Sequence, residues 1–249
     1  MNRSAREAML NALGLAALVL VAWQLLYWIV GEIAFRSPAE TLVFTAKLIS
    51  TSAFQTHLAE TAQAFGVALL LAILIGLAIG FLLGLSRFAS EVLEPVLVAL
   101  YSIPKITLYP ILLLMFGLGI SAKIAFGTLH GIVPIALFTI AAVRNVRPVF
   151  LKSGRVMGLD PLAMIGRILL PAALPEIFAG LRIGFSLTLI GTLLGEMFAS
   201  QRGLGYLLMN AIGLHNIDLI MALTLLLTLF AGAASGLMLY LGGRLPERA

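Results

Sequence analysis

Six long apolar runs constrain this 249-residue chain more than any other feature of its sequence. A helix needs about 20 mostly apolar residues to cross the hydrocarbon core of a bilayer. Soluble domains have about 25% charged residues, whereas here 61% of the residues are hydrophobic and 11% are charged. We therefore expect an all-α, polytopic integral membrane protein with about six transmembrane helices. The runs cover 13–33, 62–85, 106–118 with a backward extension through 96–102, 124–143, 177–198 and 217–241.

Two of these runs are less regular than the others. The first follows Arg3 and Arg6, as the apolar core of a signal peptide would. It is too long for such a core and no small-residue cleavage site follows it, so we expect a retained first helix. The third run contains Pro104 and Pro110. Each proline removes a backbone hydrogen bond that a neighbouring helix or water must replace.

The basic residues predict how the chain is oriented in the membrane. With the N-terminus in the cytoplasm, the inside segments are the N-terminal tail, 86–105, 144–182 and the C-terminal tail. These hold twelve basic residues: Arg3, Arg6, Arg87, Lys105, Arg144, Arg147, Lys152, Arg155, Arg167, Arg182, Arg244 and Arg248. The outside segments hold four: Arg36, Lys47, Lys123 and Arg202. Since Lys and Arg accumulate on the cytoplasmic side, we expect both termini to be cytoplasmic.

Missing motifs exclude several classes of function. The chain has no cysteine, which excludes disulfides, zinc–thiolate sites, iron–sulfur clusters and thiol nucleophiles. It has no Gly-Lys dipeptide for a phosphate-binding loop, no His-Glu-x-x-His motif and no Gly-x-Ser-x-Gly elbow. We expect no enzyme activity, no metal, no bound cofactor and no nucleic-acid partner. A partner ATPase or an ion gradient must therefore supply the energy for any transport.

Small residues recur at every fourth position of the second run. Such residues let the backbones of two membrane helices approach closely. We expect them to pack within one helical bundle, and a subunit interface is the alternative. The residues are Ala68, Ala72, Gly76, Gly80 and Gly84, with shorter repeats at Gly180/Gly184, Gly191/Gly195 and Gly232/Gly236.

The longest cytoplasmic segment, 144–176, has a pattern too ordered for a flexible linker. Pro148 suits the first position of a short helix that runs to Met157. Gly158 then suits the left-handed position that commonly ends a helix. The pattern predicts a short helix followed by a tight turn.

A second short helix is expected directly after this turn. Asp160 is a good N-cap and Pro161 a good first helical residue. We expect this helix to cover 161–169 and to stop before Pro171. Apolar side chains beside basic ones suit docking into a groove on a soluble partner. The expected apolar contacts are Leu159, Leu162, Met164 and Ile165, and the nearby basic residues include Lys152 and Arg155.

The loop resembles the cytoplasmic signature loop of binding-protein-dependent ABC importer permeases. The resemblance rests on Gly158, on Ile168 nine residues later, and on Leu170-Pro171. In that family the loop begins Glu-Ala-Ala, whereas this chain has Lys152-Ser153-Gly154, so no contact of the glutamate carries over. The resemblance implies a type I ABC importer permease fold. It also implies an ATPase-coupling role for Lys152, Arg155, Gly158, Leu159, Asp160, Pro161, Ile168, Leu170 and Pro171.

Other segments resemble the nitrate/sulfonate/taurine group of these permeases, over about residues 55–245. They are Ile103-Pro104-Lys105-Ile106 with Pro110, Phe116-Gly117-Leu118-Gly119, Ser121-Ala122-Lys123-Ile124, Leu170-Pro171-Ala172-Ala173-Leu174-Pro175, Gly180-Leu181-Arg182, and Gly195-Glu196-Met197 followed by Gly203-Leu204-Gly205-Tyr206. The resemblance implies a homodimer in a bacterial inner membrane. It also implies two ATPase subunits that bind ATP and Mg, and a periplasmic substrate-binding protein. We expect 1–54 to form an N-terminal transmembrane helix and periplasmic loop, and 55–249 the core permease domain.

Polar residues in or near the apolar runs are candidates for the substrate pathway. They are Ser102, Thr107, Tyr109, His130, Ser186, Thr188, Thr192 and Glu196. The fifth run borders the pathway in the resembling family, which is why its three hydroxyl residues are included. Hydroxyls can instead bond their own helix backbone, and His130 can bond a neighbouring helix. Glu196 can face water at the membrane surface or pair with Arg202.

Three functional hypotheses follow, and the first is favoured. It is a permease subunit of an ATP-driven importer, for a small organic or inorganic anion such as a sulfonate, taurine or nitrate. The substrate is a family-level expectation, because we expect no basic residue deep in a run. A gradient-driven secondary transporter needs ionisable residues at the bilayer midplane, and the runs offer little beyond His130. A membrane scaffold without transport would not require the ordered loop.

Overall fold

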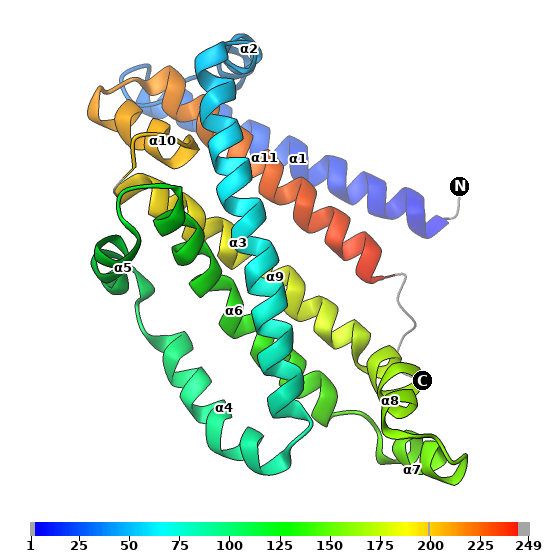
Figure 1. Ribbon diagram of the computed structural model, residues 1–249. Helices are drawn as coiled ribbons and strands as arrows, with labels where there is room; N and C mark the ends of the chain where they lie inside the picture. The colour runs from blue at the N-terminus through cyan, green and yellow to red at the C-terminus, as the bar shows by residue number, and fades with distance from the viewer. Residues whose placement is uncertain (1–2, 199, 244–249) are drawn as a thin grey trace. The chain divides into compact units, whose positions relative to one another are not determined.

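The computed structural model describes residues 3–198 and 200–243, and every regular element in these ranges is helical (Figure 1). This confirms the all-α class. Of the basic residues that set the expected orientation, Arg244 and Arg248 lie outside the described residues, as do the side chains of Arg3 and Arg6. In chain order the elements are α1 (Arg3–Val30), α2 (Pro38–Ile49), α3 (Ser52–Gly84), α4 (Arg87–Ser102), η1 (Lys105–Leu108), α5 (Tyr109–Phe116), α6 (Ile120–Arg144), α7 (Pro148–Val156), α8 (Pro161–Met164), η2 (Ile165–Leu169), α9 (Leu170–Phe198), α10 (Leu204–Gly213) and α11 (Ile217–Gly242).

Four helices in the described part of the chain are long and apolar enough to cross a membrane. They are α3, α6, α11 and the continuous helix Pro161–Phe198, which joins α8, η2 and α9. The pair formed by α4 and Lys105–Phe116 counts as a fifth if it is one broken span. Four or five of the expected spans are therefore found among the described residues. The first run lies in α1, and Gly14–Val30 of this helix is a further apolar helical stretch.

The third expected span is not one straight helix, because the chain bends by 87° between α4 and η1. Ile103 and Pro104, which follow α4, have extended backbones. A proline disfavours the helical conformation in the residue before it, which explains the break at Ile103. Pro110, in contrast, lies in the first turn of α5, where its missing N–H costs little. Gly117, at φ +73°, ends α5.

The chain forms two compact units. The first combines Met1–Thr56 with Leu207–Phe230, and the second combines His57–Tyr206 with Ala231–Ala249. In the first unit, the Arg36 guanidinium pairs with Asp218 at 2.6 Å.

A capping box starts α2, also in the first unit. The Ser37 hydroxyl accepts a hydrogen bond from the Glu40 N–H, and the Glu40 carboxylate accepts one from the Ser37 N–H. The Ser37 side chain and then its N–H hold the pKa of the Glu40 carboxyl below its ordinary value. These two reciprocal hydrogen bonds satisfy N–H groups that the start of a helix leaves unpaired.

The core of the second unit is built on α3, α6 and α9, which pack with very close backbones (Figure 1). A Cβ on Gly76 would lie 2.8 Å from the Ile135 side chain, and one on Gly84 would lie 2.9 Å from Val143. Glycines of α9 face α6 in the same way. The small residues of α3 therefore pack within one chain, as expected, whereas Gly232 and Gly236 on α11 face open space.

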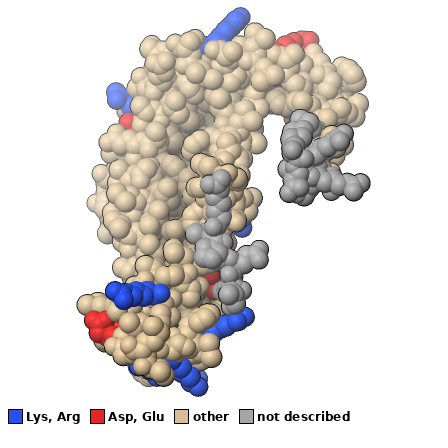
Figure 2. All heavy atoms as spheres, turned by 90° about the vertical axis from the view of Figure 1, so that its right-hand side faces the viewer, with Lys and Arg blue, Asp and Glu red and all other residues tan. Residues whose placement is uncertain are grey.

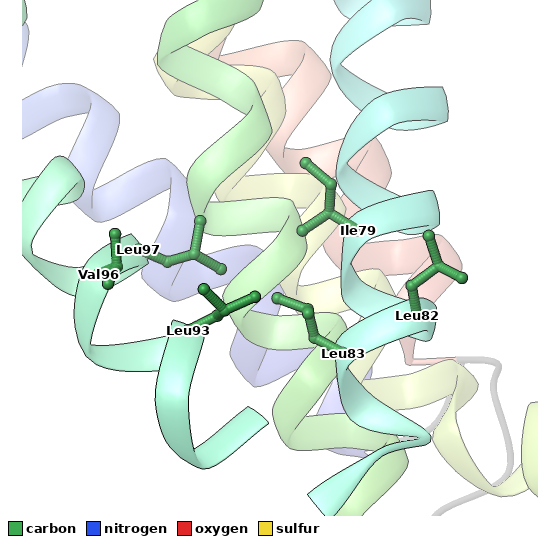
Figure 3. Close-up of a pocket in the computed structure, with 6 residues that line it drawn as sticks. All are labelled: Ile79, Leu82, Leu83, Leu93, Val96 and Leu97. Carbon is green, nitrogen blue, oxygen red and sulfur yellow. The ribbon is translucent and has the colours of Figure 1, made fainter. Parts of the chain in front are cut away.

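An apolar groove of about 270 Å³ lies between α3 and α4 (Figure 3). Its wall is entirely aliphatic, from Ile79, Leu82, Leu83, Leu93, Val96 and Leu97. A wall without polar atoms offers no hydrogen bond to a polar solute. This groove therefore contributes nothing to polar recognition.

Candidate functional site

The loop at 144–176 folds as two helices around a Gly158 turn, as the sequence predicts. The Gly158 N–H donates to the Arg155 carbonyl at 3.0 Å, and the Leu159 N–H donates to the Gly154 carbonyl at 3.1 Å. These two bonds form a Schellman motif, with Gly158 at φ +69° in the left-handed position. The Asp160 carboxylate then accepts from the Ala163 N–H at 2.9 Å and caps α8. The turn is thus fixed by backbone hydrogen bonds to α7 on one side and by the Asp160 side-chain cap on the other.

The second loop helix does not stop before Pro171. Instead, α8 continues through the π-helical turn η2 into α9, and Pro161–Phe198 is one helix of 38 residues. The Leu170 N–H donates to the Ile165 carbonyl, five residues back. A π-turn changes the local register of the hydrogen-bond ladder, and a proline interior to a helix needs such an adjustment. Proline at this position therefore bends the ladder without ending it.

Close contact between the two loop helices explains why this chain has Gly154 where the family loop has an alanine. Gly154 is buried, and a Cβ there would lie 2.6 Å from Ile168 Cδ1 and from Met164 Sδ. Met164 therefore packs against α7 and is half-buried, within the exposed or semi-exposed range expected for it. The side chains of Lys152 and Arg155 are exposed.

The outward side of the loop presents apolar residues among basic ones. Of the four expected apolar contacts only Leu162 is exposed, whereas Leu159, Met164 and Ile165 are half-buried. Sequence reasoning missed three further exposed apolar side chains, those of Val149, Val156 and Met157. On the face shown in Figure 2, Lys and Arg gather at the lower end, where Figure 1 draws α7 and α8. The ends of α7 and α8 thus form an apolar patch with a basic surround.

Most of the expected pathway hydroxyls bond the backbone of their own helix. The hydroxyls of Ser102, Ser186 and Thr192 donate to the carbonyls four residues back, at 2.9–3.3 Å. Thr107 donates to the Pro104 carbonyl at 2.8 Å. The Thr188 hydroxyl is buried and has no hydrogen-bond partner in the structure. The helix-backbone alternative therefore describes these residues well.

Aromatic packing surrounds the expected pathway residue His130. Its Nδ1 lies 2.9 Å from the Phe126 carbonyl oxygen, one turn earlier in α6. The His130 ring packs edge-on against Phe126, and Phe126 packs against Tyr109. The Tyr109 hydroxyl donates to the Gly195 carbonyl. The structure thus brings Tyr109 and His130 together, while Ser102 and Thr107 are exposed elsewhere.

A buried charged cluster at the end of α9 was not expected. Glu196 is fully buried, and its carboxylate accepts hydrogen bonds from the Thr61 hydroxyl and the Gly205 N–H, each at 2.9 Å. Thr61 in turn accepts from the Leu204 N–H at 2.7 Å. Glu196 therefore caps the start of α10, where free N–H groups favour a negative charge. The expectation that it faces water or pairs with Arg202 is wrong.

Lys123 completes this cluster from α6. Its side chain is 2% exposed, and its ammonium pairs with Glu60 at 3.0 Å and donates to the Arg202 carbonyl at 2.8 Å. The Gly203 N–H donates to His57 Nδ1 at 3.1 Å. The motifs Ser121-Ala122-Lys123 and Gly195-Glu196-Met197 signal this site in the sequence, but nothing local signals their partners on α3.

Comparisons with known proteins agree with these features. A family model described as binding-protein-dependent transport system inner membrane component matches residues 72–246. A probable ABC transporter permease protein of Haemophilus influenzae is 32% identical over 219 residues, which cover 88% of this chain and 89% of the relative. The taurine transport system permease protein TauC of Escherichia coli is 31% identical over 155 residues, which cover 62% of this chain and 56% of the relative.

The fold is also that of a solved transporter. Inward-facing structures of the MetNI methionine ABC transporter match with a TM-score of 0.63 at 22% sequence identity. The match covers 74% of this chain and 90% of the matched chain. It confirms the type I ABC importer permease fold expected from the sequence.

Proposed function

Because the chain belongs to the family of binding-protein-dependent transport system inner membrane components, we propose that it imports a small organic or inorganic anion, such as a sulfonate, taurine or nitrate. As a permease of this family it is a non-catalytic, multi-pass inner membrane protein. The name of its Escherichia coli relative supports a sulfonate, because taurine is an aminoethanesulfonate.

Separate ATPase subunits bind ATP and Mg and supply the energy. The observation that carries this proposal is the capped loop, whose exposed Val156, Met157 and Leu162 lie beside the basic side chains of Lys152 and Arg155. Exposed apolar groups with a charged rim are typical of protein docking surfaces. We place this patch in a groove on the ATPase. ATP and Mg are thus cofactors of the partner, and none is assigned to this chain.

The remaining partners follow from the family. A periplasmic substrate-binding protein delivers the anion, and a second copy of the chain completes a homodimer in the lipid bilayer. The excess of basic residues in the inside segments supports cytoplasmic N- and C-termini.

The continuous helix Pro161–Phe198 supports a direct coupling mechanism. Closure of the ATPase subunits on ATP displaces the docked loop. Because α8 passes into α9 without a loop, the displacement reaches the membrane-spanning part of the helix at once. The π-turn η2 is the deformable point between the two parts. The helix bundle then alternates between inward-facing and outward-facing states.

The glycine turn provides the test of coupling. In Gly158→Val, a β-branched residue must adopt φ near +69°, which costs about 1–2 kcal/mol. We expect binding-protein-stimulated uptake to fall at least fivefold per ATP hydrolysed, since that strain corresponds to a factor of roughly 5–30. Gly66→Val on α3 is the matched control, because Gly66 lies outside the loop and η2, does not have a left-handed φ and has open space around its Cβ position. Normal coupled uptake by Gly158→Val would show that the loop does not transmit the motion.

A further inference from the structure

A second groove, distinct from the aliphatic one between α3 and α4, lies among α4, α9 and α11. Its volume is about 300 Å³. Four polar side chains line it, Tyr101 from α4, Arg182 and Ser186 from α9, and Ser235 from α11. Ile183 and Leu187, also from α9, contribute aliphatic wall. The groove is therefore lined by one cation, three hydroxyl groups and aliphatic side chains.

Arg182 is the charge in this groove, and it has no acidic partner among the described residues. The four ion pairs of the described chain use other cations: Arg36, Arg87, Lys123 and Arg144. A guanidinium does not lose its proton, and an ionised side chain within a membrane helix is costly unless something compensates it. Arg182 lies half-buried inside the 38-residue helix that spans the membrane.

A second cation lies over the Tyr101 ring. Lys105 Nζ is 4.9 Å from the centre of that ring and donates to the Tyr101 carbonyl at 3.2 Å. Both cations raise the potential around Tyr101. The bend at Ile103-Pro104 brings Lys105 back over Tyr101 instead of continuing the helix.

We propose that this groove binds the transported anion, and that the anion has a charged head on a short aliphatic chain, as an alkyl sulfonate or carboxylate does. This inference rests on the proposed function and narrows it. Arg182 is suited to a planar or tetrahedral oxyanion head because its N–H groups form a fixed fork. Ser235 supplies a hydroxyl donor, whereas the Ser186 hydroxyl donates to the Arg182 carbonyl. The aliphatic wall takes the chain. The apolar wall favours such an anion over nitrate, which has no apolar part.

The volume agrees with a small ligand. Sites for small molecules are concave, mostly apolar and carry a few placed polar groups, with volumes from about 300 Å³ upward. This groove lies at that lower limit. Arg182 sits eleven positions after Pro171 in the helix that the loop moves, so the ATPase cycle can change the groove.

The absence of cysteine permits a direct test. Ser235→Cys places a single thiol in the groove, and Ser52→Cys places one at an exposed control position. The thiols are labelled with two methanethiosulfonate reagents, one carrying a sulfonatoethyl group and one a trimethylammonioethyl group. We expect the ratio of anionic to cationic labelling rates to be about tenfold higher at position 235 than at position 52, because an unpaired cation concentrates anions locally.

Arg182 must cause this preference. Adding Arg182→Gln should abolish it at position 235 and leave position 52 unchanged, and Arg182→Lys, which keeps the charge, should retain part of it. Both Arg182 variants are checked for a single size-exclusion peak. If the Gln variant does not fold, the Arg182→Lys variant still tests the preference. A ratio at position 235 equal to that of the control, or one that persists in folded Arg182→Gln, would overturn the proposal.

Competition identifies the source of the anion. Ethanesulfonate is added to the Ser235→Cys protein in nanodiscs of neutral lipid or of phosphatidylglycerol. If ethanesulfonate slows methanethiosulfonate labelling of Ser235→Cys in neutral nanodiscs, the groove is a site for a solute. Protection by phosphatidylglycerol alone, with none from ethanesulfonate, would assign the groove to a lipid headgroup and overturn the proposal. Labelling needs neither ATPase nor uptake, so its failure is distinguishable from failure of the proposed function.

Discussion

Individual charges at the start of α6 and the end of α9 stabilise the backbone of a neighbouring turn. Lys123 bonds the Arg202 carbonyl, and Glu196 accepts from the Gly205 N–H. Both side chains are at most 2% exposed. A buried charge without its partner is costly. These residues are therefore expected to be sensitive to substitution for structural reasons.

Loss of Lys123 should lower stability strongly. Lys123→Met keeps the aliphatic stem but leaves Glu60 and the Arg202 carbonyl without their partner. We expect the free energy of unfolding to fall by about 3 kcal/mol, as for other broken buried ion pairs. Reversible unfolding in mixed micelles measures this change.

An exposed pair supplies the control for that measurement. Arg87→Met removes a pair with Glu91 whose side chains are 88% and 52% exposed, so it should cost less than about 1 kcal/mol. Equal losses for the two variants would contradict the structural role of Lys123.

At this scale the sequence identifies some residues but not their partners. The Gly195-Glu196-Met197 motif marks Glu196, and its position suggested the membrane surface. Its partner Thr61 is 135 residues away, and no local pattern predicts such a pairing. The hydroxyl bonds of Ser186 and Thr192 were predictable, because they depend only on the helix that carries them.

In the second unit, glycines on one helix let the neighbouring helix pack closely against it. Gly80→Ala should destabilise the protein, although alanine is the better helix former, because a Cβ there would collide with the Thr139 side chain and lie 3.0 Å from the Ala136 carbonyl. Gly66→Ala on the same helix has open space and should be neutral or stabilising by up to about 1 kcal/mol. Apparent melting temperatures in detergent compare the two. A higher melting temperature for Gly80→Ala would refute the close packing of α3 on α6.

The start of α2 should be sensitive to acid. Hydrogen bonds from Ser37 lower the pKa of the Glu40 carboxyl, so its contribution is present above the unfolded-state pKa and is lost as pH falls through the lowered folded-state value. We expect amide protection in the first turn of α2 to decrease over that acid range. In Glu40→Gln the protection should no longer follow this titration. Hydrogen exchange by mass spectrometry reads the difference, and identical acid profiles for both proteins would exclude the capping role.

Elements with local signals were predicted well, and elements set by distant contacts were not. The Gly158 turn and the Asp160 cap depend on adjacent residues and were found as expected. The end of the second loop helix before Pro171 was wrong, because the π-turn η2 lets the helix continue. The break at Pro104 was anticipated as a weak point, but its 87° bend depends on tertiary packing.

For the whole molecule, the central claim is that ATP hydrolysis by a partner drives transport through this permease. Family membership and the type I fold establish the class. The proposed mechanical connection is the loop, which continues directly into the long apolar helix Pro161–Phe198. A gradient-driven transporter would need no such connection.

Uptake into proteoliposomes tests this claim most directly. The vesicles contain the permease with its ATPase subunits, the binding protein is outside, and the probes are radiolabelled taurine, ethanesulfonate and nitrate. We predict that uptake of at least one probe requires ATP and both partners and persists when ionophores collapse proton and sodium gradients. Accumulation by the permease alone, driven by either gradient and independent of ATP, would contradict the account.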